Sequence, residues 1–334
     1  MIKGLFPVLA FGSILLLLEL TKYQFPVWAS QSSHLSSGAV SQSSSNKFKV
    51  IVLGSGVGPR VDLQQFGAGI LVVAGDERLL FDCGRGVTLR MAQIGISHGS
   101  VNRLFLTHLH SDHVIQIPDL FLTGWVGGGR KNPLEVWGPP GTKEMMYHIQ
   151  QAFGFDIHMR RDVDEKVPGD GSKVLSNDIV EGVVFDKQGV KVTAFLVDHS
   201  PVKPAFGYRI DYGGRSVVLS GDTRVSENLI RFAKGTDVLV HEVLDIGTVK
   251  SWFPNNPGMV DAILAKHTTP EQAGEIFTRI KPRLAVYSHA PNAERVINET
   301  RKTYKGPLQG AEDLLTIEIG ETIEIHHFVN DSVK

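Results

Sequence analysis

Short runs of β-branched and other apolar residues, separated by glycine turns, dominate the chain from Phe48 onward. Runs of four to eight such residues between turn signals are typical of strands. The pattern therefore predicts a protein that is built mainly on β-sheet, in both halves of the sequence. The expected strands cover residues 49–53, 70–73, 79–81, 103–106, 134–137, 190–197, 206–210, 216–219, 238–240, 284–287 and 315–319.

Helical spacing occurs in a few of the segments between these runs. The segment 270–280 carries the clearest signals, because Thr269 can cap the first turn, Pro270 suits the first helical position and Gln272 lies three residues beyond the cap. Its apolar positions also fall on one helical face. No internal repeat and no second break in composition divides the sequence, so we expect one catalytic domain over 47–328 with a short tail, 329–334. The expected helices are one after Gly86 and those at 142–153, 226–234, 270–280 and 291–303.

The first 46 residues differ from the rest in composition. Lys3 precedes an apolar run from Leu5 to Leu18, and small residues follow near Ala29, as in a secretory signal peptide. A membrane anchor is the alternative, but Glu19 interrupts the run before it reaches the roughly 20 residues that span a bilayer. We therefore expect a cleaved signal peptide (1–29), a Ser-rich flexible linker (30–46), and a protein exported to the periplasm or medium without a membrane span.

Charge and cysteine content narrow the function classes. The formal net charge is −1, and acidic and basic residues are interspersed, so no basic stripe of the kind that tracks a phosphate backbone is evident. Nucleic acid is therefore an unlikely partner on this criterion. Cys83 is the only cysteine, which rules out an intramolecular disulfide, and it lies in an apolar run that predicts a core position.

The strongest chemical signal is Thr107-His108-Leu109-His110-Ser111-Asp112-His113, directly after the expected strand 103–106. In extended backbone, alternate side chains point the same way, so His108 and His110 can hold one ion. The chain can then bend to offer Asp112 and His113 to a second ion. A mixture of imidazole and carboxylate ligands suits zinc.

This His-x-His-x-Asp-His sequence resembles the metal-binding motif of the metallo-β-lactamase superfamily. The resemblance implies a four-layer αββα sandwich and three more ligands, for which His199, Asp222 and His289 each follow an expected strand. It places one metal on His108, His110 and His199, a second on Asp112, His113 and His289, and Asp222 between the two. Two Zn²⁺ ions are expected, with Mn²⁺ or Fe as an option at one site.

Further motifs resemble the ribonuclease Z branch of the superfamily, over residues 48 to 290. They include Phe81-Asp82-Cys83-Gly84, Gly207-Tyr208-Arg209-Ile210, Ser220-Gly221-Asp222-Thr223 and His241-Glu242. The resemblance gives Glu242 and His267 a catalytic role, with Glu242 orienting His267 and His267 protonating the leaving oxygen. Two departures are evident: only a short hairpin joins Tyr208 to Ser220 where long-arm enzymes carry a tRNA-binding arm, and Gln116 replaces an expected glycine.

These observations favour an exported hydrolase that uses a hydroxide shared by two zinc ions to cleave a small phosphodiester or related ester. The same chemistry leaves open lactone, amide or aryl sulfate hydrolysis, ribonuclease Z-type RNA 3′-processing, and a non-catalytic metal-binding scaffold. A homodimer is compatible with all of them. Two loops could select the substrate, and their expected contacts are Trp125, Trp252 and Phe253.

Overall fold

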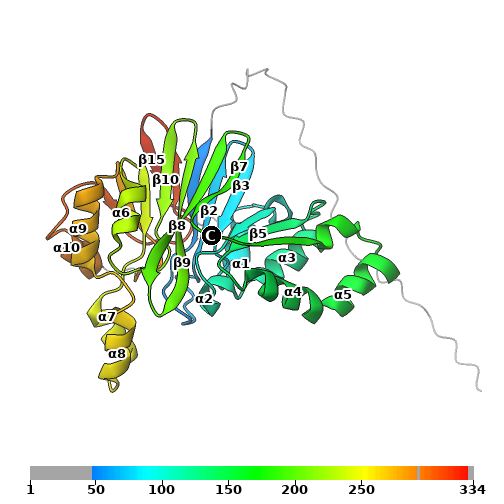
Figure 1. Ribbon diagram of the computed structural model, residues 1–334, viewed down its shortest axis with the longest axis horizontal. Helices are drawn as coiled ribbons and strands as arrows, with labels where there is room; N and C mark the ends of the chain where they lie inside the picture. The colour runs from blue at the N-terminus through cyan, green and yellow to red at the C-terminus, as the bar shows by residue number, and fades with distance from the viewer. Residues whose placement is uncertain (1–46, 292–293, 330–334) are drawn as a thin grey trace, which may run out of the picture. The chain divides into compact units, whose positions relative to one another are not determined.

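Two β-sheets face each other in the computed structural model, which describes residues 47–291 and 294–329 (Figure 1). The first sheet has the order β15 (Ile323–His326), β14 (Thr316–Ile319), β1 (Phe48–Gly54), β2 (Gly69–Ala74), β3 (Glu77–Phe81), β4 (Arg103–Phe105), β5 (Leu134–Gly138) and β6 (Val174–Asp178). The second has the order β13 (Leu308–Gln309), β12 (Leu284–Tyr287), β11 (Val238–His241), β10 (Arg215–Leu219), β9 (Val202–Tyr212), β8 (Val190–His199) and β7 (Gly182–Lys187).

The main core lies between the sheets, and β1 shows why its sequence is apolar throughout. Val50 and Val52 belong to the core between the sheets, whereas Ile51 and Leu53 belong to a second core under the helices of the first sheet. Successive side chains of a strand point to opposite faces, so a strand that is covered on both faces needs apolar residues at every position.

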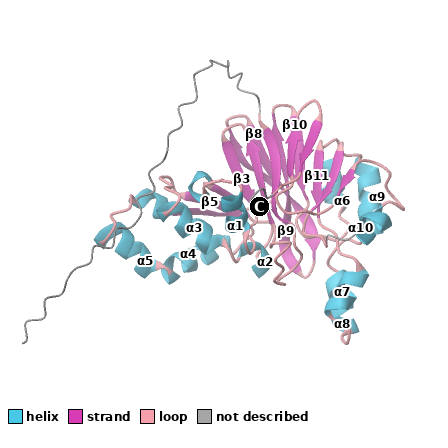
Figure 2. Ribbon diagram, turned by 180° about the vertical axis from the view of Figure 1, so that it is seen from behind, coloured by secondary structure: helices cyan, strands magenta, loops and turns pink. Residues whose placement is uncertain are grey.

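Helices cover the outer face of each sheet (Figure 2). α1 (Val87–Gln93), α3 (Ile117–Val126) and α4 (Thr142–Ala152) pack on the first sheet, and α6 (Glu227–Ala233), α9 (Pro270–Ile280) and α10 (Glu294–Thr300) pack on the second. The four layers confirm the expected αββα sandwich. The remaining helical segments are α2 (Ser111–Val114), α5 (Gly154–His158), α7 (Ile246–Trp252), α8 (Pro257–Leu264), the π-helix Met159–Val163 and the 3₁₀ turns His98–Ser100 and Gly169–Ser172.

Most predicted elements are present within a residue or two of their expected bounds. The capping box of α9 is formed, because the Thr269 hydroxyl accepts from the Gln272 N–H (3.4 Å) and Gln272 Oε1 accepts from the Thr269 N–H (3.0 Å). The elements not predicted from the sequence are α2, α3, α5, α7, α8 and the strands β6, β7, β13 and β15. The expected signal peptide and linker lie outside the described residues.

Six strands end at the same rim of the sandwich. β3 and β4 run parallel in the first sheet, and β10, β11 and β12 run parallel in the second. β8 runs antiparallel to β9, which runs antiparallel to β10, so β8 shares their direction. Loops at the carboxyl ends of these strands can therefore bring side chains from both sheets together.

The connection between β9 and β10 is a two-residue turn at Gly213 and Gly214. Both residues have positive φ, 58° and 75°, which glycine adopts without a steric penalty. The expected absence of a long insertion at this point is thus confirmed. Within the described residues, no helix is long and apolar enough to cross a membrane.

Candidate metal centre

The structure brings the seven predicted ligands together at the shared rim. His108 and His110 follow β4, and α2 carries Asp112 and His113. From the second sheet, His199 ends β8, while Asp222 and His289 come shortly after β10 and β12.

The first group of ligands consists of three imidazoles that face one another. His110 Nδ1 lies 3.0 Å from His108 Nε2 and 3.4 Å from His199 Nε2. Asp222 Oδ2 is 3.9 Å from the Nε2 atoms of both His108 and His199. Each neutral imidazole carries a lone pair on one ring nitrogen, and lone pairs that converge in this way repel one another. A cation bound between the nitrogen atoms removes this repulsion, so the arrangement favours a metal ion.

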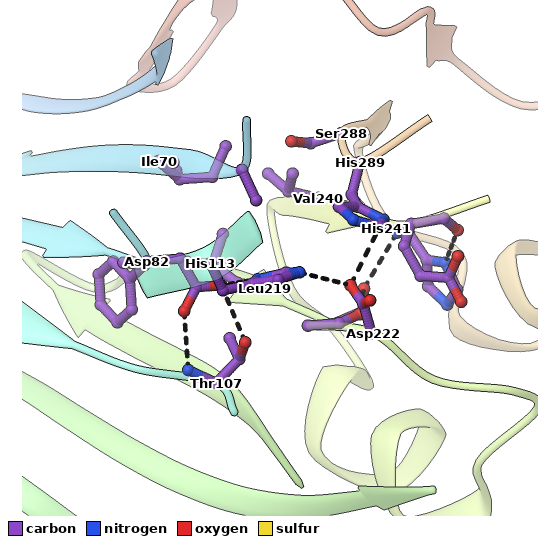
Figure 3. Close-up of a pocket in the computed structure, with 16 residues that line it drawn as sticks. Ile70, Asp82, Thr107, His113, Leu219, Asp222, Val240, His241, Ser288 and His289 are labelled. Atoms are coloured by element: carbon purple, nitrogen blue, oxygen red, sulfur yellow. Dashed lines mark hydrogen bonds and ion pairs between the residues drawn. The ribbon is translucent and has the colours of Figure 1, made fainter. Parts of the chain in front are cut away.

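The second group faces the other oxygen of Asp222 (Figure 3). His113 Nε2 lies 3.5 Å from Asp222 Oδ1 and 3.6 Å from Asp112 Oδ2. His289 contacts the same two carboxylates, with Nε2 3.3 Å from Asp112 Oδ2 and Nδ1 3.4 Å from Asp222 Oδ1. Asp222 therefore presents one oxygen to each group, as a bridging ligand would.

Unsatisfied buried atoms support a cation in the second group. His113 Nε2, Asp222 Oδ1 and His289 Nδ1 have no hydrogen-bond partner in the part of the chain that the structure describes. Each buried polar atom left without a partner costs about 1–3 kcal/mol, so such atoms require an explanation. The residues present fit a pair of metal ions, each held by imidazole and carboxylate donors.

Asp82 has a role that the sequence analysis missed. It follows β3, next to β4, and its carboxylate accepts hydrogen bonds from His113 Nδ1 (2.8 Å), the Thr107 N–H (2.9 Å) and the Thr107 hydroxyl (2.8 Å). Thr107 Oγ1 in turn accepts from His108 Nδ1 (3.0 Å). The Asp82 carboxylate thus orients His113 directly and His108 through Thr107. In the sequence, the only sign of this role was the position of Asp82 directly after an apolar strand.

The carboxylates give this region a strongly negative potential. Burial lowers the pKa of His113, but Asp222 and Asp82 outweigh burial and hold that pKa well above its ordinary value. Asp112 remains below its ordinary pKa, because its hydrogen bond to His289 and the charge of His113 together outweigh burial. An environment that stabilises positive charge on an imidazole also stabilises a bound cation.

Close backbone packing fixes the segment that carries Asp112. Gly84 lies against it, and a Cβ on Gly84 would come within 2.3 Å of the Asp112 carbonyl oxygen. The Cys83 N–H also donates to the His113 carbonyl (2.7 Å). Only glycine permits this approach, which holds α2 at the rim.

Glu242 and His267 form the expected pair beside the ligands. Glu242 is buried, and its Oε2 accepts a hydrogen bond from His267 Nδ1 (3.2 Å). Burial lowers the pKa of His267, but the charge and hydrogen bond of Glu242 raise it to about 9. The His267 ring lies 5.2 Å from that of His199 and 6.0 Å from that of His289, between centroids. The His267 ring therefore lies beside both groups of ligands.

The expected substrate contacts have mixed outcomes. Trp125 is fully buried, and its Nε1 donates to the Pro168 carbonyl (2.8 Å), so its prediction as a substrate contact is wrong. The segment around Trp125 belongs to α3 and packs on the sheet instead of forming the expected loop. Trp252 and Phe253 are half-buried at the end of α7, and Trp252 lines a cleft beside the centre. Gln116 precedes α3, and its side chain accepts from the Gly86 N–H (3.1 Å) and donates to Asp119 (2.9 Å).

Residues 77–290 match the family model described as the β-lactamase superfamily domain. Ribonuclease Z of Mycolicibacterium gilvum is 36% identical over 247 residues, which are 72% of this chain and 83% of that protein. Among solved structures, the metallo-β-lactamase fold protein YhfI of Bacillus subtilis has a TM-score of 0.63 at 19% identity, covering 81% of this chain and 99% of that one. The short form of human tRNase Z has a TM-score of 0.62 at 21% identity, with coverages of 81% and 99%. Similarity to a ribonuclease counts against the expectation that nucleic acid is an unlikely partner.

Proposed function

The chain is a metal-dependent hydrolase of the β-lactamase superfamily, on its ribonuclease Z-like branch, and we propose that it cleaves phosphodiester bonds in RNA. The observation that carries the proposal is the Glu242–His267 pair beside seven converging ligand side chains. This pair occurs in a chain that is similar to ribonuclease Z of Mycolicibacterium gilvum over 83% of the length of that protein. This proposal replaces the small ester as the leading substrate.

We assign His108, His110 and His199 to one zinc ion, and Asp112, His113 and His289 to the other, with Asp222 shared. Bound there, two such ions would supply Lewis-acid chemistry, by polarising the phosphoryl oxygens and by making a water molecule more acidic. The protein orients the ligands: Asp82 accepts from His113, and the Lys266 carbonyl accepts from His199 Nδ1 (3.2 Å).

His267 is suited to protonating the leaving oxygen. Its Nδ1 donates to Glu242, and no hydrogen bond occupies Nε2 within the described residues. In hydrolysis, a water oxygen forms the new bond to phosphorus, the bond from phosphorus to the leaving oxygen breaks, and His267 Nε2 gives that oxygen its proton. The ionised Asp112 carboxylate is placed to orient the water or accept its proton. Acid catalysis of this kind typically contributes about 100- to 10,000-fold in rate.

Near-neutral net charge does not argue against RNA as strongly as the sequence analysis assumed. Net charge averages over the whole surface, whereas an anionic substrate responds to the local field of the cleft that it enters. Two bound dications would offset the charge of the carboxylates at the centre, and Arg60 and Arg85 line the cleft that adjoins it.

A small phosphodiester remains a second candidate, because of one observation. The two-residue turn between β9 and β10 leaves no arm at this point to grip a large RNA. Both candidates use the same centre, and they differ in what lies beyond the reacting phosphate.

The test uses purified, zinc-loaded protein and a hairpin RNA with a single-stranded 3′ extension, with bis(p-nitrophenyl) phosphate as the small diester. We expect endonucleolytic cleavage near the junction of stem and extension, and its loss in His110→Ala. Efficient hydrolysis of the small diester with no cleavage of the RNA would contradict the proposal and favour the second candidate.

A further inference from the structure

A cleft of about 440 Å³ lies beside the metal centre, between the loop 56–67 and helix α7. A smaller cleft of about 110 Å³ adjoins it and includes Ser111 and Asp112 in its wall. The two clefts share Gly58, Arg60 and Gly67 as lining residues, so a continuous surface leads from a proposed metal ligand to Trp252.

Helix α7 contributes Thr248 and Trp252 to the wall of this cleft. Together with α8, it lies beyond the sheet ends on the side where α2 lies (Figures 1 and 2). A small apolar cluster around Val249 and Val260 holds the two helices together, and Val57 and Trp252 pack against it. Trp252 is therefore fixed on the helix pair and contacts the loop that leads to the metal centre.

Two arginines in the clefts lack ion-pair partners. Arg60 and Arg85 are both exposed, and no ion pair of either occurs among residues 47–291 and 294–329. The Arg60 guanidinium lies 5.2 Å from the centre of the Trp252 ring, within the range of a cation–π contact.

The two clefts differ in charge. In the larger cleft, Asp313 accepts from Arg90 Nε (3.0 Å), but Asp62 is exposed and has no ion-pair partner within the described residues. In the smaller cleft, which adjoins the centre, the only carboxylate among the lining residues is that of the proposed ligand Asp112. Arg60 and Arg85 therefore form a positive site for phosphates at the end of the cleft beside the centre.

We propose that this cleft binds the single-stranded RNA segment next to the reacting phosphodiester. Arg60 and Arg85 contact its phosphates, and a base stacks on Trp252 in the place that Arg60 takes over the ring in the free protein. This assignment rests on the proposed function. It concerns the nucleotides next to the reacting phosphodiester, which the metal centre itself does not contact. Flexible single strands are bound in this way, by cations that follow the backbone and by aromatic rings that accept any base.

The test measures binding of a short phosphorothioate RNA, which resists cleavage, to the zinc-loaded protein by fluorescence anisotropy. Loss of one stacked base should weaken binding by about 5- to 150-fold in Trp252→Ala, with a smaller loss in Trp252→Phe. Arg60→Ala and Arg85→Ala should each reduce the slope of log affinity against log salt by about 0.7, because each removes one phosphate contact. Trp252→Ala should leave that slope unchanged.

Arg78→Ala is the matched control, since Arg78 is exposed near the start of β3, at the opposite end of the strand from the centre, and also makes no ion pair within the described residues. It should bind like the wild type. Arg78→Ala should also hydrolyse bis(p-nitrophenyl) phosphate like the wild type. In the three cleft variants, the loss on RNA should exceed any loss on this diester, which has no neighbouring nucleotide to bind in the cleft.

The outcomes separate the two proposals. Wild-type affinity and salt dependence in all three cleft variants would overturn the cleft assignment, even if the protein cleaves RNA. Equal losses on RNA and on the small diester would also overturn it, because they would indicate damage to the centre. If the wild type binds RNA through Trp252 but does not cleave it, the proposed function is wrong and the binding cleft stands.

Discussion

Replacing Glu242 by glutamine isolates the contribution of its charge to the proton-donor role of His267. Glu242 Oε1 accepts from the N–H groups of Thr223 (3.2 Å) and Thr268 (3.0 Å), whereas Oε2 faces His267. The amide oxygen of glutamine can keep both backbone hydrogen bonds, and its NH₂ group then faces Nδ1. The substitution should therefore preserve the local structure and remove the charge.

The magnitude follows from the pKa of His267. Glu242 raises it from 6.5 to about 9 against the opposing effect of burial, so the pair favours the protonated imidazole by about 3 kcal/mol. In the metal-free protein, this raised pKa keeps His267 protonated at neutral pH, and the proton is lost as pH rises through about 9. Without the carboxylate, burial and Lys266 lower the pKa and only the charge of Asp222 still raises it, so the protonated fraction at neutral pH should fall.

The assay is a series of aryl and alkyl phosphodiesters, hydrolysed by zinc-loaded wild type, Glu242→Gln and His267→Ala. Glu242→Gln should lose about tenfold or more in kcat on alkyl leaving groups, which need protonation, and little on p-nitrophenolate. NMR titration of protein stripped of metal by a chelator should show the lowered pKa of His267 directly. Equal losses on all leaving groups, or an unchanged pKa in Glu242→Gln, would refute the proton-donor role.

Four further outcomes are expected. His110→Ala should abolish activity on every substrate and lower the metal content in elemental analysis, whereas His267→Ala should retain both ions. Asp82→Asn should weaken zinc binding about 10- to 100-fold in a competition titration with a chelator, because His113 loses its orienting carboxylate; unchanged affinity would deny Asp82 this role. Gly84→Ala should reduce activity by displacing the Asp112 segment, visible as lower zinc affinity, while the matched substitution Gly154→Ala, at a position with open space and without a positive φ, should not. N-terminal sequencing of the exported protein should find a chain that begins near residue 30, and an intact Met1 would contradict the signal-peptide prediction.

Local sequence patterns predicted the sandwich and the ligand cluster because both follow from short-range rules. The β1 strand is apolar throughout because two cores meet it, and His108 to His113 follow a strand whose end must lie at a rim. The predicted grouping of ligands also depended on family resemblance, since His199 and His289 are remote in sequence from His108.

The errors have physical causes. Gly127 to Gly129 favour a loop directly after Trp125, but the residues before them form α3, whose apolar face packs on the sheet. The role of Asp82 depends on β3 pairing with β4, which no local pattern reveals. The expectation about nucleic acid came from net charge, and net charge contains no information on where Arg60 and Arg85 lie.

The most direct test of the dinuclear centre is anomalous diffraction at the zinc edge from crystals of the zinc-loaded protein. The account predicts two peaks. One should lie about 2.0–2.2 Å from His108 Nε2, His110 Nδ1 and His199 Nε2, and the other at that distance from Asp112, His113 Nε2 and an imidazole nitrogen of His289, with one Asp222 oxygen on each. His267 should coordinate neither ion. A single peak, or a peak bound by His267, would contradict the two-metal centre and its proton donor.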